Sequence, residues 1–132
     1  MMNWSPFWSH ILDFWRMRSE DHVLFLRFEE MKADLPAVVR KVAKFLGKAV
    51  TEEEVEKLAD HCSFGSMSKN KAVNNEDIIS PASERTKNIK FMRKGQVGDW
   101  KNHLTEEQVK AFKAWTMKNL QGSDFPYYKD YE

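Results

Sequence analysis

A short segment in the second half of the chain combines positive charge with two glycines. From Arg85 to Gly98 there are five basic residues and no acidic one. Gly95 and Gly98 let the backbone turn sharply, which brings N–H groups close to a bound anion. Arg93 and Lys94 add a planar guanidinium and an ammonium, a pair that suits phosphate. The segment therefore predicts either a phosphate-binding loop or a basic loop that only faces water.

Other groups that could do chemistry are sparse. Cys62 is the single cysteine, so no internal disulfide can form, and we expect a reducing, cytoplasmic setting. The adjacent pair His61-Cys62 is the one candidate for metal ligation, and it lacks a second cysteine at zinc-site spacing, so we expect no metal. The histidines are scattered along the chain: His10, His22, His61 and His103.

Length, composition and charge bound the class of protein. The 132 residues suit one modest domain, and 42% hydrophobic and 13% aromatic residues rule out a disordered chain. Lys and Arg number 21 against 20 Asp and Glu, so the net charge is +1. That balance argues against a general nucleic-acid binder and a polybasic membrane binder. We expect no membrane span, because no apolar run reaches about 20 residues. We expect no signal peptide either, because Met1-Met2-Asn3-Trp4 lacks a basic region followed by a long apolar stretch.

Apolar residues at helical spacing predict two helices in the first half of the chain. The first begins at Ser5-Pro6, with proline in the first helical position, and ends near Ser19-Glu20. The second has Asp34 as its N-terminal cap and stops at Gly47, where glycine can adopt the left-handed conformation.

Two capping boxes predict two further helices. They start at Thr51 and Thr105, each with Glu or Gln three residues later, and the second of these helices ends at Gly122. The polar stretch Ser63–Asn88 between them is expected to be irregular. The residues expected to face inward on the last helix are Val109, Phe112, Trp115 and Leu120.

One segment reads as a strand. Val23–Phe28 begins with a continuous apolar run, which is typical of a strand buried on both faces of a parallel sheet. A single strand leaves its backbone groups without partners. Either this segment is not a strand, or the chain is the end of a longer domain; we favour the second interpretation. The fold class is then α/β, with this chain itself mostly helical.

The glycine-rich segment belongs to a longer string, R-K-G-x-x-G-D-W-K. It resembles the signature near the C-terminus of the cytosolic sulfotransferases, which use 3′-phosphoadenosine 5′-phosphosulfate (PAPS) as sulfuryl donor. The matching residues are Arg93-Lys94-Gly95, Gly98 and Asp99-Trp100-Lys101. The resemblance runs from about Trp4 to Trp115, and the other segments that agree in order and spacing are Phe28-Glu29-Glu30-Met31, Phe45-Leu46-Gly47 and Cys62–Met67.

The resemblance implies that residues 1–132 form the C-terminal part of one sulfotransferase domain. Its fold would be a parallel-sheet, P-loop-like nucleotide-binding fold whose phosphosulfate loop and N-terminal strands are absent here. Arg93, Lys94 and Gly95 would bind the 3′-phosphate, and Phe64 would stack on the adenine. The remaining residues of the donor site would be Phe28, Cys62, Ser63, Met67, Phe91 and Met92.

The chain departs from the family pattern at several positions. Phe28 stands where tyrosine is usual, and Cys62 where threonine is common, so two polar contacts with the nucleotide are lost or weakened. The family's dimer motif keeps Lys101 and Thr105 but is degraded at Glu106 and Lys110, which puts a homodimer in doubt. The family's catalytic histidine has no counterpart, so we expect no catalytic residue in this chain and no activity from it alone.

Three hypotheses about function remain open. The first is a sulfotransferase that moves a sulfuryl group from PAPS to a hydroxyl or amine of a small acceptor, leaving 3′-phosphoadenosine 5′-phosphate (PAP). The second is a non-catalytic, truncated helical interaction module. The third is a nucleic-acid-binding loop built on Arg85–Lys94.

Overall fold

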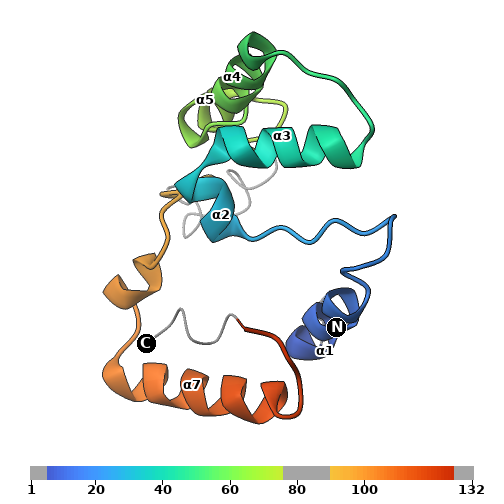
Figure 1. The fold of residues 1–132 in the computed structure, drawn as a ribbon. Helices are drawn as coiled ribbons and strands as arrows, with labels where there is room; N and C mark the ends of the chain where they lie inside the picture. The colour runs from blue at the N-terminus through green and yellow to red at the C-terminus, as the bar shows by residue number, and fades with distance from the viewer. Residues whose placement is uncertain (1–5, 76–89, 127–132) are drawn as a thin grey trace. The chain divides into compact units, whose positions relative to one another are not determined.

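The structure is a computed structural model that describes residues 6–75 and 90–126 (Figure 1). These residues form helices and connecting segments, and no strand is present among them. The chain divides into two compact units, residues 1–25 with 98–132 and residues 26–97. The helices are α1 (Phe7–Arg16), α2 (Phe28–Ala33), α3 (Leu35–Phe45), α4 (Glu52–His61), α5 (Phe64–Lys69), the 3-10 helix η1 (Asp99–Asn102) and α7 (Glu106–Leu120).

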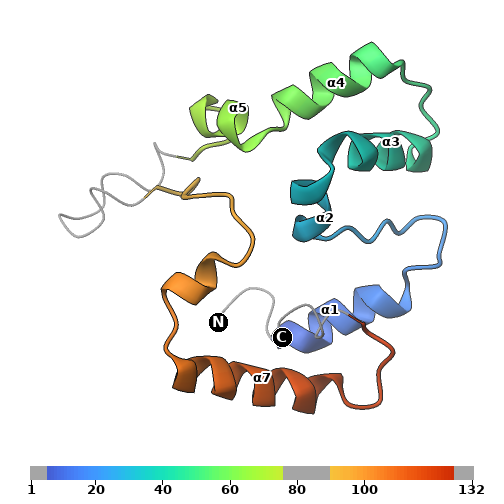
Figure 2. The same ribbon diagram turned by 60° about the vertical axis from the view of Figure 1, so that its left-hand side comes forward.

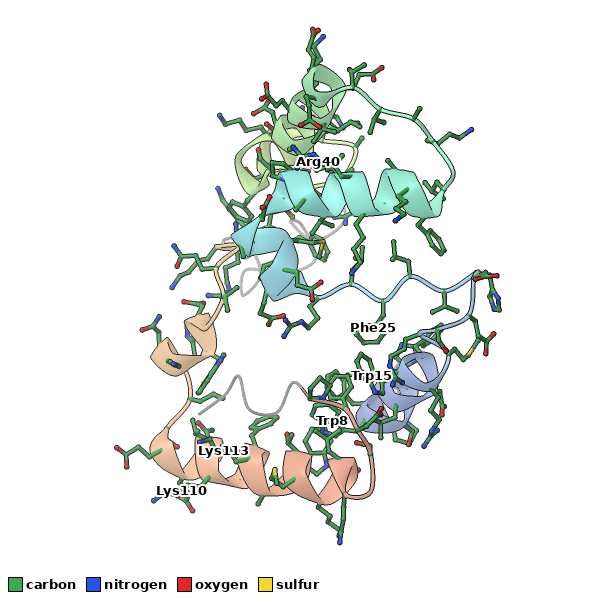
Figure 3. The ribbon with its side chains drawn as sticks, viewed as in Figure 1. Trp8, Trp15, Phe25, Arg40, Lys110 and Lys113 are labelled. Atoms are coloured by element: carbon green, nitrogen blue, oxygen red, sulfur yellow. The ribbon has the colours of Figure 1, made fainter. Side chains whose placement is uncertain are left out.

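Aromatic rings form the core of the first unit. Trp8, Leu12, Leu120 and Phe125 are buried together, so α1 packs against the end of α7 and the segment after it. The ring of Phe125 lies edge-on to Trp8, with centroids 6.0 Å apart, and to the Trp15 ring at 5.1 Å. Figure 3 shows Trp8 and Trp15 gathered beside α1. Phe125 is buried, so an aromatic side chain holds the segment after α7 against this core.

A carboxylate on the same segment ties it to α1. The Trp15 indole donates a hydrogen bond of 2.8 Å from Nε1 to Asp124 Oδ1, and Arg18 donates one of 2.7 Å to Asp124 Oδ2. The indole hydrogen bond, followed by the charge of Arg18, lowers the pKa of Asp124. The Arg18 guanidinium also lies 4.1 Å from the Trp15 ring centroid, a cation–π contact.

Small aliphatic side chains hold the second unit together. α3 and α4 are in contact, and their buried side chains are Val38 and Ala43 on α3 and Val55 and Ala59 on α4. Figure 2 shows α2 leading into α3 and the loop that joins α3 to α4. The cap predicted at Asp34 is confirmed, because its Oδ1 accepts a 2.9 Å hydrogen bond from the Ala37 backbone N–H.

Both predicted capping boxes are confirmed. In α4, the Thr51 hydroxyl accepts from the Glu54 backbone, and the Glu54 carboxylate accepts from the Thr51 backbone N–H at 2.7 Å. In α7, Gln108 makes the equivalent contact with the Thr105 N–H at 2.8 Å. Each capping box is formed within four consecutive residues, so the local sequence is sufficient to predict it.

The strand predicted at Val23–Phe28 is wrong for the described residues. Val23 to Arg27 has no regular secondary structure, and Phe28 begins α2. A strand requires a neighbour for its backbone groups, and residues 6–75 and 90–126 supply none. Glu29 and Glu30 in the first turn of α2 favour a helix there, since they complement its positive N-terminal dipole. The parallel sheet stays a prediction.

The ends of the first helix also differ from the prediction. α1 stops at Arg16 rather than near Ser19-Glu20, and Pro6 is its N-cap rather than its first helical residue. Ser5 lies outside the described residues.

The polar stretch between the capping boxes is not irregular throughout. Helix α5 lies inside it, because the Ser63 hydroxyl accepts a 3.1 Å hydrogen bond from the Ser66 N–H and caps the helix. Residues 76–88 of this stretch lie outside the described ones.

The last helix buries less of its apolar face than expected. Leu120 is buried and Val109 half-buried, but Phe112 is 54% exposed and Trp115 is 42% exposed. In this unit α1 contacts α7, and the buried cluster takes only Leu120 from this helix, at its C-terminal end. The inward prediction is therefore wrong for Phe112, whereas the partly exposed Trp115 ring lies 5.9 Å from the ring of the buried Trp8.

The two capping boxes should respond differently to acid. The Thr51 backbone N–H is the main cause of the lowered pKa of Glu54, so the stabilisation is present above the unfolded pKa of about 4.3 and is lost as pH falls through the lowered folded value. Gln108 has no carboxyl to protonate. We expect amide protection, corrected for intrinsic exchange, to fall at the start of α4 before it falls at the start of α7.

The matched variant is Glu54→Gln, which converts the α4 box to the type found in α7. It should remove this difference between the two helices. Parallel loss of protection at both helix starts in the unsubstituted chain would contradict the role of Glu54.

Candidate functional site

The segments that carry the two halves of the predicted site meet in the second unit. Phe64 is the first residue of α5, and Gly95 follows Arg93-Lys94 in a left-handed conformation with φ of +60°. A Cβ on Gly95 would lie 2.1 Å from Phe64 Cδ2 and 2.6 and 2.7 Å from its ring neighbours Cγ and Cε2. These similar distances put the glycine above the ring face rather than beyond its edge. The glycine thus satisfies both a backbone and a packing requirement.

The predicted phosphate-binding side chains lie next to this contact in sequence. Arg93 and Lys94 are exposed, and Gly95 is half-buried. A guanidinium and an ammonium adjacent to a close-approaching backbone form a combination that can hold a phosphate by charge and by N–H donors. Arg85 and Lys87, the first residues of the basic run, lie outside the described residues.

The residues predicted to line the base pocket lie at the junction of α4 and α5. Cys62 is the exposed C-cap of α4, while Ser63 caps α5 and therefore uses its hydroxyl oxygen locally. Met67 is half-buried, one turn after Phe64 on α5. The junction thus brings one ring and one thioether to the same short helix, next to Gly95.

The structure does not bring all the predicted residues together. Phe28, at the start of α2, is 46% exposed, and Phe91 is 57% exposed. Both rings are thus open to solvent, unlike the half-buried ring of Phe64. Met92, beside Phe91, is half-buried.

Two features escaped sequence reasoning. Lys32, on α2, places its ammonium 5.9 Å from the centroid of the Phe64 ring, although in the sequence it is an ordinary helix lysine. In the first unit, His103 Nε2 lies 3.1 Å from Oδ2 of the buried Asp99, which also accepts a hydrogen bond from Asn102. The spacing of four residues between Asp99 and His103 is the signal that could have revealed this pair.

Residues 6–75 and 90–126 hold neither a metal-binding cluster nor a membrane-spanning helix. They contain no group of three or more His, Cys, Asp or Glu side chains that could hold a metal ion. None of the described helices combines the length and the apolar character that crossing a bilayer requires.

Comparison with known proteins defines the family. A profile described as "Sulfotransferase domain" matches residues 1–124. The chain therefore belongs to the sulfotransferase family, which confirms the resemblance carried by the R-K-G-x-x-G-D-W-K string.

Named relatives agree with this assignment. Luciferin sulfotransferase of Photinus pyralis is 39% identical over 122 residues, which are 90% of this chain and 33% of that protein. Cytosolic sulfotransferase 5 of Arabidopsis thaliana is 41% identical over 125 residues, covering 89% of this chain and 38% of that protein. The chain thus spans 33% to 38% of the length of these relatives.

Solved structures give the same result. Retinol dehydratase in a complex with retinol and PAP has a TM-score of 0.84 and 32% identity, covering 96% of this chain and 37% of that one. A mouse sulfotransferase complexed with PAP has a TM-score of 0.77 and 27% identity, covering 98% of this chain and 46% of that one.

The contact between Gly95 and Phe64 can be tested by adding a methyl group. Gly95→Ala should destabilise the chain by more than Gly47→Ala. Both glycines have positive φ, so each alanine costs about 1–2 kcal/mol of backbone strain, but a Cβ at position 47 meets nothing within 4 Å. The clash with Phe64 should add roughly 1–3 kcal/mol. Urea unfolding of the two variants measures the difference, and equal losses would contradict the contact.

Proposed function

We propose that this chain forms the 3′-phosphate and adenine side of the donor site in a sulfotransferase. The enzyme would transfer a sulfuryl group from PAPS to a hydroxyl or amine of a small acceptor and release PAP. The observation that carries the proposal is the packing of Gly95, within Arg93-Lys94-Gly95, over the face of Phe64. Family membership supports the reaction class, and the PAP in the two similar structures supports the nucleotide.

The chemistry of the side chains fits a nucleotide that carries a phosphate. The half-buried ring of Phe64 can stack on a purine with the area that Gly95 leaves uncovered. Arg93 and Lys94 supply charge-assisted donors for phosphate oxygens, and the left-handed Gly95 lets its backbone approach them. When bound, PAPS supplies the activated sulfuryl group; this chain's own residues bind and orient the nucleotide.

The same proposal covers the remaining predicted contacts. Cys62, Ser63 and Met67 would border the base, and Met92 with the exposed Phe91 ring would flank the nucleotide. Phe28 would offer a ring without the hydroxyl of the usual tyrosine. We assign no catalytic residue to this chain and expect no sulfuryl transfer from it alone.

The fold of the whole domain is part of this proposal. Residues 1–132 would be the C-terminal part of a parallel-sheet, P-loop-like domain. Names of relatives such as Cytosolic sulfotransferase 5 support a cytoplasmic location.

Local roles account for the two matching residues of the family's dimer motif. The Thr105 hydroxyl accepts a hydrogen bond from the Gln108 N–H at 3.3 Å, and the Lys101 ammonium lies 5.5 Å from the Trp100 ring centroid. Together with the substitutions at Glu106 and Lys110, this favours structural roles over homodimer contacts.

Removing one guanidinium tests the proposed site. Arg93→Ala should weaken the binding of PAP to the chain by roughly 1.5–3 kcal/mol, the scale of a hydrogen bond to a charged group. Calorimetric titration with PAP measures the change. The control is Arg16→Ala, which removes an exposed guanidinium of the other unit that pairs with Asp13. Equal affinities of the Arg93→Ala variant and the unsubstituted chain would refute the assignment.

A second candidate function is favoured by the uncovered rings of the first unit. Phe7, Phe112 and Trp115 are exposed, with the Trp115 centroid 6.1 Å from each of the other two rings, which suits a helical interaction module. This module should be oligomeric or poorly folded by itself. Thermal unfolding monitored at two protein concentrations tests it, and a cooperative, concentration-independent transition of a monomer would count against it.

A further inference from the structure

The ammonium of Lys32 lies over the ring that would stack on the base. Lys32 is in the last turn of α2, and its Nζ is 5.9 Å from the centroid of Phe64. The nearby carboxylate of Glu30 is engaged elsewhere, since it lies 3.1 Å from Arg27 Nε and 3.9 Å from Lys41 Nζ. The Lys32 ammonium thus lies near an aromatic ring, while the Glu30 carboxylate of the same helix is close to two other cations.

Two contacts restrict the orientation of this ring. Gly95 lies above Cδ2 of Phe64, and the Lys32 cation is attracted to the electron-rich face of the same ring. The contacts come from different parts of the second unit, α2 and the segment after Lys94, so two separate segments restrict the orientation of the Phe64 ring. A ring held before the ligand arrives loses less conformational freedom on binding.

We propose that Lys32 is a positioning residue of the nucleotide site, which acts through the ring of Phe64 and does not contact a phosphate. The inference rests on the proposed function. It assigns to α2 a role in adenine recognition that is separate from the 3′-phosphate contacts of Arg93 and Lys94. Its consequence is that the adenine moiety, with or without a 3′-phosphate, should sense the loss of the Lys32 cation.

The binding experiment separates the ring from the phosphate. Lys32→Met keeps the length of the side chain and removes its charge. It should weaken the binding of PAP and of adenosine 5′-phosphate by the same factor, about two- to fivefold. Lys32→Arg should restore affinity, because a guanidinium also binds to an aromatic face. In a Phe64→Leu background, Lys32→Met should leave the affinities for PAP and for adenosine 5′-phosphate unchanged.

Three results would overturn the proposal. One is a loss of nucleotide affinity on Lys32→Met that persists in the Phe64→Leu background. Another is a loss larger for PAP than for adenosine 5′-phosphate and shrinking with added salt, which would indicate a direct phosphate contact. The third is unchanged affinity in the Lys32→Met variant.

A ligand-free measurement distinguishes this inference from the proposed function. NMR should show nuclear Overhauser effects between the Lys32 side chain and the Phe64 ring, while Lys57, whose ammonium lies 2.7 Å from Glu53, serves as the control lysine. If these effects are present but the unsubstituted chain binds neither nucleotide, the proposed function fails, and the role of Lys32 fails with it. If the chain binds PAP and the effects are absent, only the role of Lys32 is overturned.

Discussion

The approach of Gly95 to the face of Phe64 is the constraint on which the candidate site depends. A side chain at position 95 would overlap the ring, and the positive φ of this residue is one that other residues rarely adopt. One glycine thus allows the basic segment to reach α5. Because Arg93 and Lys94 immediately precede it, the same contact brings two cations to the neighbourhood of an aromatic ring.

The partial burial of Phe64 distinguishes it from the core ring of Phe125. Phe125, in the first unit, is buried against Trp8 and Trp15 and has little surface left for a ligand. Phe64 instead keeps part of its surface open, beside exposed cations. A core ring with part of its surface exposed would lose hydrophobic stabilisation, whereas a ring that stacks on a ligand needs an exposed surface.

The sequence predicts structure where the determinants are local. The boxes at Thr51 and Thr105 need only four residues each, and both are present. The strand at Val23–Phe28 and the inward ring of Phe112 are different, because an apolar pattern indicates that a side chain tends to be buried but does not identify the residues that cover it. The described residues bury the side chains of these segments only in part, and the relatives are much longer than this chain.

The sequence motif and the packing of the helices define different residues of the candidate site. The R-K-G string singles out Arg93, Lys94 and Gly95, since spacing and residue type are readable without a fold. The contact with Phe64, 31 residues earlier, and the cation of Lys32 depend on how α2 and α5 pack, which no local pattern encodes. The candidate site is built from three separate segments, and its geometry is more precise for that reason, because each segment restricts a ring or a backbone that another segment contacts. Its geometry is therefore a property of the packed second unit and cannot be assigned to the basic loop alone.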